Sequence, residues 1–223
     1  MTEAEWMACT DPRLMLKLLR GRASERKLRL FLVACARTVW DQITDPVMRR
    51  AVDTAERYVD GRAASEEHQT AHGEVYRLAC DRSHFFSDKA SMMGVSIGQY
   101  MSFFGLSLSC GFSKAALDTL ETTNAWASGA ELTAHLQPSI LRDIFGHSFQ
   151  PATIASTLLD WNNSTVVNLA QSIYEDRAFD HLPGLADALE DAGCHDIDIL
   201  AHCRQPGTHI RGCWVVDLLL GKR

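Results

Sequence analysis

The residues best able to do chemistry lie close together near the end of the chain. Three cysteines and three histidines fall within 20 residues: Cys194, His195, His202, Cys203, His209 and Cys213. A structural zinc site needs four ligands in a tetrahedron, and short turns between helices can bring them together. The spacing Cys194-x8-Cys203-x5-His209-x3-Cys213 predicts such a site. The alternative is a set of buried cysteines with surface histidines, which the absence of a Cys-x2-Cys pair favours.

A second pair of potential ligands lies in the middle of the chain. His68 and His72 are four residues apart, so both imidazoles lie on one face of a helix. In the zinc-protease motif a glutamate follows the first histidine, but Gln69 stands there in this chain. The general base of a metalloprotease is therefore missing, and a polar, exposed helix face is the favoured interpretation.

Composition and charge restrict the classes of function. The chain is 46% apolar and 22% charged with a net charge of −6, which is typical of a globular protein and not of a strongly basic nucleic-acid binder. Local basic segments at residues 20–29 and at Arg49-Arg50 leave a nucleic-acid-associated subunit as an alternative. The sequence holds neither a Gly-x-Ser-x-Gly elbow nor a phosphate-binding loop.

Cysteine usage and the first residues predict a cytoplasmic protein. The chain has seven cysteines, an odd number, and its acidic first residues have no apolar segment of the kind that export signals carry. Free thiols in a reducing compartment are expected. The most apolar stretch, residues 92–112, is interrupted by glycines and serines, so no membrane association is expected.

The elements that must position these residues are predicted to be helices. Thr2 and Glu5 form a capping box, and Asp11-Pro12 and Asp45-Pro46 are typical helix starts. Leu28, Phe31, Leu32, Cys35 and Val39 recur at helical spacing and predict one buried face. We expect an all-α, multi-helix bundle of about ten to twelve helices with antiparallel neighbours. Residues 1–223 are expected to form a single domain, with a subdivision into 1–144 and 145–223 as the alternative.

Helix boundaries follow from the same signals. The predicted ranges in the second half are 87–112, 113–127, 130–144, 164–176, 183–192, 196–203 and 211–220. Residues 145–163 contain Gly146, Pro151 and paired asparagines and are expected to be irregular but packed.

The two ends of the chain resemble a large bacterial protein family that has no established activity. The resemblance rests on MTEAEW at 1–6 and RKLRLF at 26–31, and on LADALEDAGC at 185–194, ILAHCR at 199–204 and RGCWVVDLLLGK at 211–222. It covers residues 1–62 and 140–223 and implies no particular activity, cofactor or catalytic residue. Residues 65–135 lie outside it, and we expect contacts particular to this protein to fall there.

The function expected from these observations is that of a non-enzymatic helical interaction module or accessory subunit whose partner is another protein. Two alternatives remain: a small metal-dependent enzyme, such as a hydrolase, that uses the histidines and cysteines, and a nucleic-acid-associated subunit. A structural zinc ion is the cofactor that the ligand pattern suggests. No catalytic residue is predicted.

Overall fold

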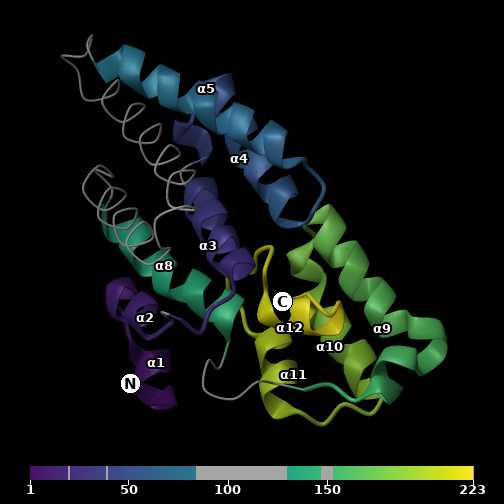
Figure 1. Ribbon diagram of the computed structural model, residues 1–223. Coiled ribbons are helices and arrows are strands. Elements are labelled where there is room, and N and C mark those ends of the chain that lie inside the picture. The colour runs from purple at the N-terminus through teal and green to yellow at the C-terminus, as the bar shows by residue number, and fades with distance from the viewer. Residues whose placement is uncertain (20, 39, 84–129, 147–152, 223) are drawn as a thin grey trace. The chain divides into compact units, whose positions relative to one another are not determined.

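The computed structural model describes residues 1–19, 21–38, 40–83, 130–146 and 153–222. Regular structure within these ranges is entirely helical, with no strand (Figure 1). The predicted all-α class is confirmed. None of the described helices is long and apolar enough to span a bilayer. The helices expected at 87–112 and 113–127, and most of segment 65–135, lie outside the described residues.

The chain divides into two compact units. The N-terminal unit comprises Ala8–Pro138, and the C-terminal unit comprises Met1–Met7 together with Ser139–Arg223. The division falls inside helix α8 (Ala130–Phe145), at Pro138. Proline cannot donate the helical hydrogen bond, so the regular bonding of α8 is interrupted at this residue.

Helices of the N-terminal unit begin where side chains satisfy free backbone N–H groups. The helices are α2 (Pro12–Leu19), α3 (Glu25–Thr38), α4 (Pro46–Val59) and α5 (Ser65–Ser83), with a short 3₁₀ turn at Trp40–Gln42. Asp45 caps α4 by accepting from the N–H of Val47 at 2.8 Å, and Asp11 accepts from the N–H of Arg13 at 2.9 Å. Helix α4 packs against both α3 and α5 (Figure 1).

Helix α3 is buried more completely than its sequence pattern predicts. Phe31, Leu32 and Cys35 are buried as expected, but every residue from 30 to 36 is buried, whichever way it points. Leu28 is only half-buried, and Val39 lies outside the described residues. The buried surface of α3 is therefore wider than the single face that the sequence predicted. Between residues 30 and 36 the helix is enclosed on all sides, and its alanines and Val33 contribute to the core as well.

This burial predicts the cost of truncating Leu32. The Leu32 side chain is 2% exposed, so Leu32→Ala should lower the free energy of unfolding of the N-terminal unit by about 2–5 kcal/mol. Leu14→Ala on α2 removes the same atoms from a residue that is 52% exposed and should cost far less. Equal losses in denaturant unfolding would show that Leu32 is not enclosed as described.

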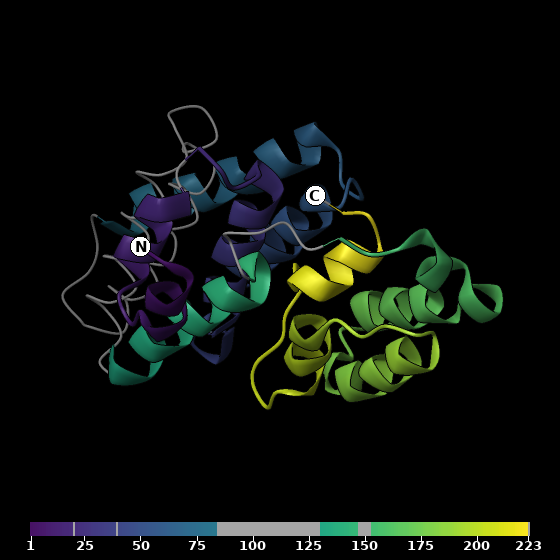
Figure 2. The ribbon, with the colours of Figure 1, turned by 90° about the horizontal axis from the view of Figure 1, so that it is seen from below.

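Helices of the C-terminal unit enclose one apolar core. They are α1 (Glu3–Ala8), α9 (Ser156–Asp176), α10 (Leu182–Asp191), α11 (Ile197–Arg204) and α12 (Trp214–Leu219), with a 3₁₀ turn at Phe179–His181. Helix α10 packs on α9 and α11, and α12 packs on the same two helices (Figure 2). The capping box predicted for α1 is present, because Thr2 and Glu5 exchange backbone-to-side-chain hydrogen bonds of 2.7 and 3.2 Å.

Helix α9 is broken by a left-handed turn where paired asparagines predicted irregular structure. Asn162, Asn163 and Ser164 have φ values of 45°, 56° and 60°, and Trp161 before them is extended. Asparagine tolerates this region better than most residues because its short side chain can hydrogen-bond locally. The helical turn before the break starts earlier than expected, at Ser156. The break lets Leu158 and Trp161 pack on the same core as the longer part of α9.

Two tryptophans meet at Gly146, directly after α8. The indole Nε1 of Trp6 donates to the carbonyl of Gly146 at 3.0 Å, in a buried contact. Gly146 has φ +54°, and a Cβ atom built on it would lie 2.7 Å from Cγ of Trp214. The contact requires glycine for two reasons, the left-handed backbone and the close approach of the Trp214 ring.

Gly146→Ala should therefore destabilise the C-terminal unit by about 2–4 kcal/mol, through the left-handed backbone and overpacking against Trp214. The matched control is Gly184→Ala in α10, where no atom lies within 4 Å of the new Cβ. At this helical position alanine should be neutral or stabilising by up to about 1 kcal/mol. Thermal or denaturant unfolding measures the stability of both variants. A Gly146→Ala protein as stable as the unmodified chain would contradict the close packing of Gly146 against Trp214.

Candidate metal centre

Four side chains of the types that bind transition metals converge in the C-terminal unit. They are Asp143, His202, His209 and Cys213, and one potential ligand atom from each lies within 4.8 Å of all the others. Asp143 comes from the last turn of α8 and His202 from α11, whereas His209 lies in the loop after α11 and Cys213 is the N-cap of α12. The group thus joins three helices and the loop between two of them.

The distances between the potential ligand atoms are close to the ligand–ligand distances of a tetrahedral metal site. Oδ1 of Asp143 is 3.2 Å from Nε2 of His202 and 2.6 Å from Nδ1 of His209, and Sγ of Cys213 is 3.2 Å from Nε2 of His202. Tetrahedral bonds of about 2.0–2.3 Å place ligand atoms about 3.3–3.8 Å apart. To accept an ion, Oδ1 of Asp143 and Nδ1 of His209 would separate by about 0.7 Å, the 3.2 Å pairs by a few tenths of an ångström, and pairs as far apart as 4.8 Å would approach by about 1 Å.

Burial shields the group from solvent. Asp143 is 3% exposed, His202 8% and Cys213 0%, and the side chain of His209 is 7% exposed. The ring of His202 also lies against two neighbours, with ring centroids 4.8 Å from His209 and 5.2 Å from Trp214. The arrangement is therefore packed as well as polar, and its members have little freedom to turn away.

Three of the four side chains are held from behind by a further contact. The second oxygen of Asp143, Oδ2, accepts from the backbone N–H of Ile210 at 2.9 Å. The remaining ring nitrogens of His202 and His209 both contact Gln205. Such outer contacts are characteristic of metal-binding histidines and carboxylates, since they fix the ring orientation and the tautomer.

The ligand loop is also tied to the end of α9. Arg211 donates from Nε to the carbonyl of Tyr174 at 3.3 Å and from Nη2 to the carbonyl of Glu175 at 3.1 Å. These carbonyls belong to the last turn of α9, where helical partners are missing and a cation is favourable. Arg211 lies between His209 and Cys213 in sequence, so its hydrogen bonds hold the backbone that carries both.

Charge within the group is balanced around Asp143. Burial by itself raises the pKa of Asp143, but hydrogen bonds from His202 and His209 and the charges of both rings outweigh it, so this pKa lies below its ordinary value. Burial lowers the pKa of His209, yet the hydrogen bond and charge of Asp143 bring it above its ordinary value. Burial, together with the charge of Asp143, raises the pKa of Cys213 well above its ordinary value. A carboxylate paired with a positive neighbour is therefore the favoured charge state.

The geometry is unsuited to a cysteine nucleophile. In a Cys–His–Asp relay the two ring nitrogens face different partners, one the thiol and the other the carboxylate. Here the same atom, Nε2 of His202, faces both Sγ of Cys213 and Oδ1 of Asp143. Cys213 is also fully buried, so a substrate carbonyl has no path to it. Convergence of all four groups on one point suits an ion better than a relay.

Two of the four zinc ligands predicted from the sequence belong to this group. His209 and Cys213 are members, whereas Cys194 and Cys203 are buried, free thiols in the surrounding core. Burial and the neighbouring Cys194 raise the pKa of Cys203 to about 12, as expected of an enclosed thiol. Their places are taken by His202 and Asp143. His202 is one of the six cysteines and histidines between residues 194 and 213, whereas the ligand pattern in the sequence does not include Asp143. Its signal is an acid within the apolar run Ile140-Leu141-Arg142-Asp143-Ile144-Phe145.

The second predicted pair of ligands is not part of a metal group in the described part of the chain. His68 is 7% exposed and stacks on Tyr58, with ring centroids 4.5 Å apart and the planes at 16°. The polar, exposed face expected there therefore does not include His68, which lies inward between α4 and α5. Tyr58 on the preceding helix supplies an apolar surface that the sequence pattern alone did not reveal.

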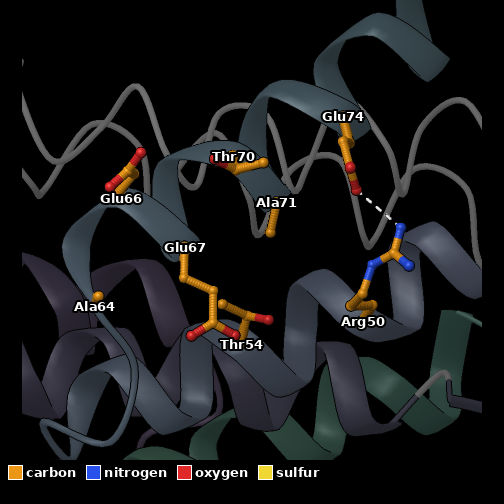
Figure 3. Close-up of a pocket in the computed structure, with 8 residues that line it drawn as sticks. All are labelled: Arg50, Thr54, Ala64, Glu66, Glu67, Thr70, Ala71 and Glu74. Atoms are coloured by element: carbon orange, nitrogen blue, oxygen red, sulfur yellow. Dashed lines mark hydrogen bonds and ion pairs between the residues drawn. The ribbon is translucent and has the colours of Figure 1, made fainter.

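A surface pocket lies between α4 and α5 in the N-terminal unit (Figure 3). Its lining comprises Arg50, Thr54, Ala64, Glu66, Glu67, Thr70, Ala71 and Glu74. Two of the three glutamates are already paired, Glu74 with Arg50 at 2.8 Å and Glu67 with Arg57. The pocket carries charged side chains from both helices and contains none of the four converging side chains.

No protein-family model, curated protein or solved structure matches this chain. The site must therefore be interpreted from its own geometry.

The buried His68 predicts a pH dependence of the N-terminal unit. Burial lowers the pKa of His68, and the charges of Arg29 and His72 lower it further. The unfolded chain therefore takes up a proton near the ordinary value of 6.5 while the folded chain does not. Stability should fall as the pH drops from about 7.5 to 5.5, and His68→Phe, which keeps an aromatic ring against Tyr58, should weaken this dependence.

Urea unfolding of the N-terminal unit at both pH values provides the measurement. His181→Gln changes an exposed histidine and serves as the control. This variant should keep the same pH dependence of stability as the unmodified protein. An unchanged pH dependence in His68→Phe would show that this ring does not determine it.

Proposed function

We propose that this chain is a non-enzymatic helical interaction module whose C-terminal unit is held together by one structural zinc ion. The observation that carries the proposal is the buried convergence of Asp143, His202, His209 and Cys213 within 4.8 Å. The proposed partner is another protein, and the metal serves to keep the binding unit folded.

The donor set favours zinc among the common metals. One thiolate, two imidazoles and one carboxylate combine soft and borderline ligands, which suit zinc in a tetrahedral site. Magnesium and calcium prefer six or more oxygen ligands, and the group offers only one carboxylate. Two imidazoles and a thiolate are therefore a poor site for either of these ions.

The number of ligands and their burial favour a structural role over a catalytic one. Catalytic zinc keeps three protein ligands and an open position for water, whereas structural zinc is enclosed by four. All four side chains here are at least nine-tenths buried. This arrangement argues against the metal-dependent hydrolase considered from the sequence.

A metal would stabilise the segment that most needs it. Residues 204–208 are exposed, and Gln205-Pro206-Gly207-Thr208 offers few apolar atoms for packing. Three of the four residues bracket this loop, with His202 before it and His209 and Cys213 after it. Since binding at such a site contributes directly to folding free energy, the ion would fix the path of the loop between α11 and α12.

Observations on the N-terminal unit weigh against the nucleic-acid alternative. Several arginines of the two basic segments are engaged within the unit: Arg26 with Asp60 at 3.4 Å, Arg29 with Glu25 at 3.2 Å and Arg50 with Glu74 at 2.8 Å. Arg49 donates to the carbonyl of Ile43 at 2.6 Å. Arginines paired in this way have less charge available for phosphates. Exposed apolar side chains that are available to a protein partner occur in both units, with Leu14 in the N-terminal unit and Ile197 in the C-terminal unit.

Metal analysis of the purified chain tests the proposal. We expect about one zinc ion per chain by mass spectrometry, and a chelator should lower the melting temperature of the C-terminal unit. Cys213→Ala should lose the metal. Cys203→Ala is the matched control, because both cysteines are 0% exposed in the same core but only Cys213 belongs to the group. Absence of stoichiometric metal after growth and refolding with zinc would overturn the proposal.

Cobalt substitution separates the structural role from the catalytic one. Four protein ligands in a tetrahedron leave no position for an added anion, so the visible spectrum of the cobalt protein should not change with azide. A spectrum that shifts with azide would indicate an open position and would favour the enzyme instead.

A further inference from the structure

Gln205 contacts both candidate histidine ligands from outside the cluster. Its side-chain Nε2 donates to Nδ1 of His202 at 3.1 Å, and its main-chain carbonyl accepts from Nε2 of His209 at 3.4 Å. In each ring the nitrogen that meets Gln205 is the one that faces away from the convergence point. One residue therefore reaches both imidazoles on the side opposite to the proposed ion.

The position of Gln205 is fixed by the local sequence. It is the C-cap of α11, and its N–H donates to the carbonyl of Ala201 at 2.9 Å. Pro206 follows it, and a residue before proline is driven into extended backbone, which agrees with its ψ of 137°. The helix end and the proline together hold both the carbonyl and the side chain in place.

We infer that Gln205 is a positioning residue of the metal centre and that its amide holds the His202 ring through Nδ1 in both tautomers. This inference rests on the proposed zinc site. With the amide nitrogen donating to Nδ1, a neutral His202 ring carries its proton on Nε2, directed at Oδ1 of Asp143 3.2 Å away. A metal bonds to the lone pair of Nε2, so that proton leaves and the ring carries its proton on Nδ1 instead.

The amide suits both forms of the ring because it has a donor and an acceptor. When Nδ1 is protonated, the amide turns so that its oxygen accepts from Nδ1. A glutamate at position 205 can only accept a hydrogen bond, so it suits only the metal-bound form, in which Nδ1 is protonated. A leucine of similar size forms no hydrogen bond with Nδ1 in either form. Gln205 thus accommodates loading and release of the ion without leaving a buried ring nitrogen unpaired.

Zinc affinity of the full chain, measured by competition with a chelator, tests the inference. Gln205→Leu should weaken zinc binding by about 10–100-fold, the usual effect of removing an outer partner, and Gln205→Glu should bind at least as tightly as the unmodified chain. Thr208→Glu adds the same charge to an exposed position of the same loop and serves as the control for charge alone. If the zinc affinity of Gln205→Glu rises no more than that of Thr208→Glu, and the affinity of Gln205→Leu does not fall, Gln205 has no positioning role.

Nitrogen NMR of the unmodified chain gives a second readout, because it locates the proton of His202 and so tests whether the Gln205 amide donates to Nδ1 without metal. The proton of His202 should be on Nδ1 with zinc and on Nε2 after chelation. The same tautomer in both states overturns the inference even if Gln205→Leu fails to fold. Zinc binding that is insensitive to Gln205 overturns this inference alone, whereas a chain that binds no zinc overturns the proposed function together with it.

Discussion

The C-terminal unit depends on how the buried carboxylate of Asp143 is satisfied. An ionised carboxylate away from water is costly unless it is paired and hydrogen-bonded. Asp143 contacts two histidines through Oδ1 and the backbone N–H of Ile210 through Oδ2. These partners lie on α11 and on the loop that follows, so one side chain from α8 determines where both must be. Arg211 and Gln205 then tie the loop to α9 and to His202, and the Trp214 ring packs against His202.

Local signals in the sequence predicted most of the helices. Helix starts follow from side chains that cap them, such as Asp45 and Asp196, and these act over two or three residues. The irregular segment before residue 164 also has a local cause, because asparagines occupy left-handed positions there. The extent of burial was harder to predict. The apolar stripe of α3 identifies one face, but whether neighbours cover the others depends on the packing of the whole unit.

The candidate site was predictable only in part, for a similar reason. His209 and Cys213 are close in sequence to the other thiols and imidazoles, so ligand spacing predicted both as metal ligands. Asp143 is 66 residues away from His209 in the chain, and no spacing rule connects them. The sequence signal that could identify Asp143 is weak, because it is an acid among mostly apolar neighbours, next to Arg142. Cys194 and Cys203 have the right chemistry but face the core, and sequence does not reveal the direction of a side chain across a turn.

The hydrogen bond from Trp6 to Gly146 has a consequence for biosynthesis. It joins residues 140 positions apart, and residues 1–7 belong to the same unit as everything from 139 onward. At about 5–20 residues per second, a ribosome needs roughly 7–28 s to make the partner of Trp6 after Trp6 itself. During that interval the indole has no native site, while the intervening unit is already emerging from the ribosome. Helix α1 can therefore take its native place only after the whole intervening unit has been made.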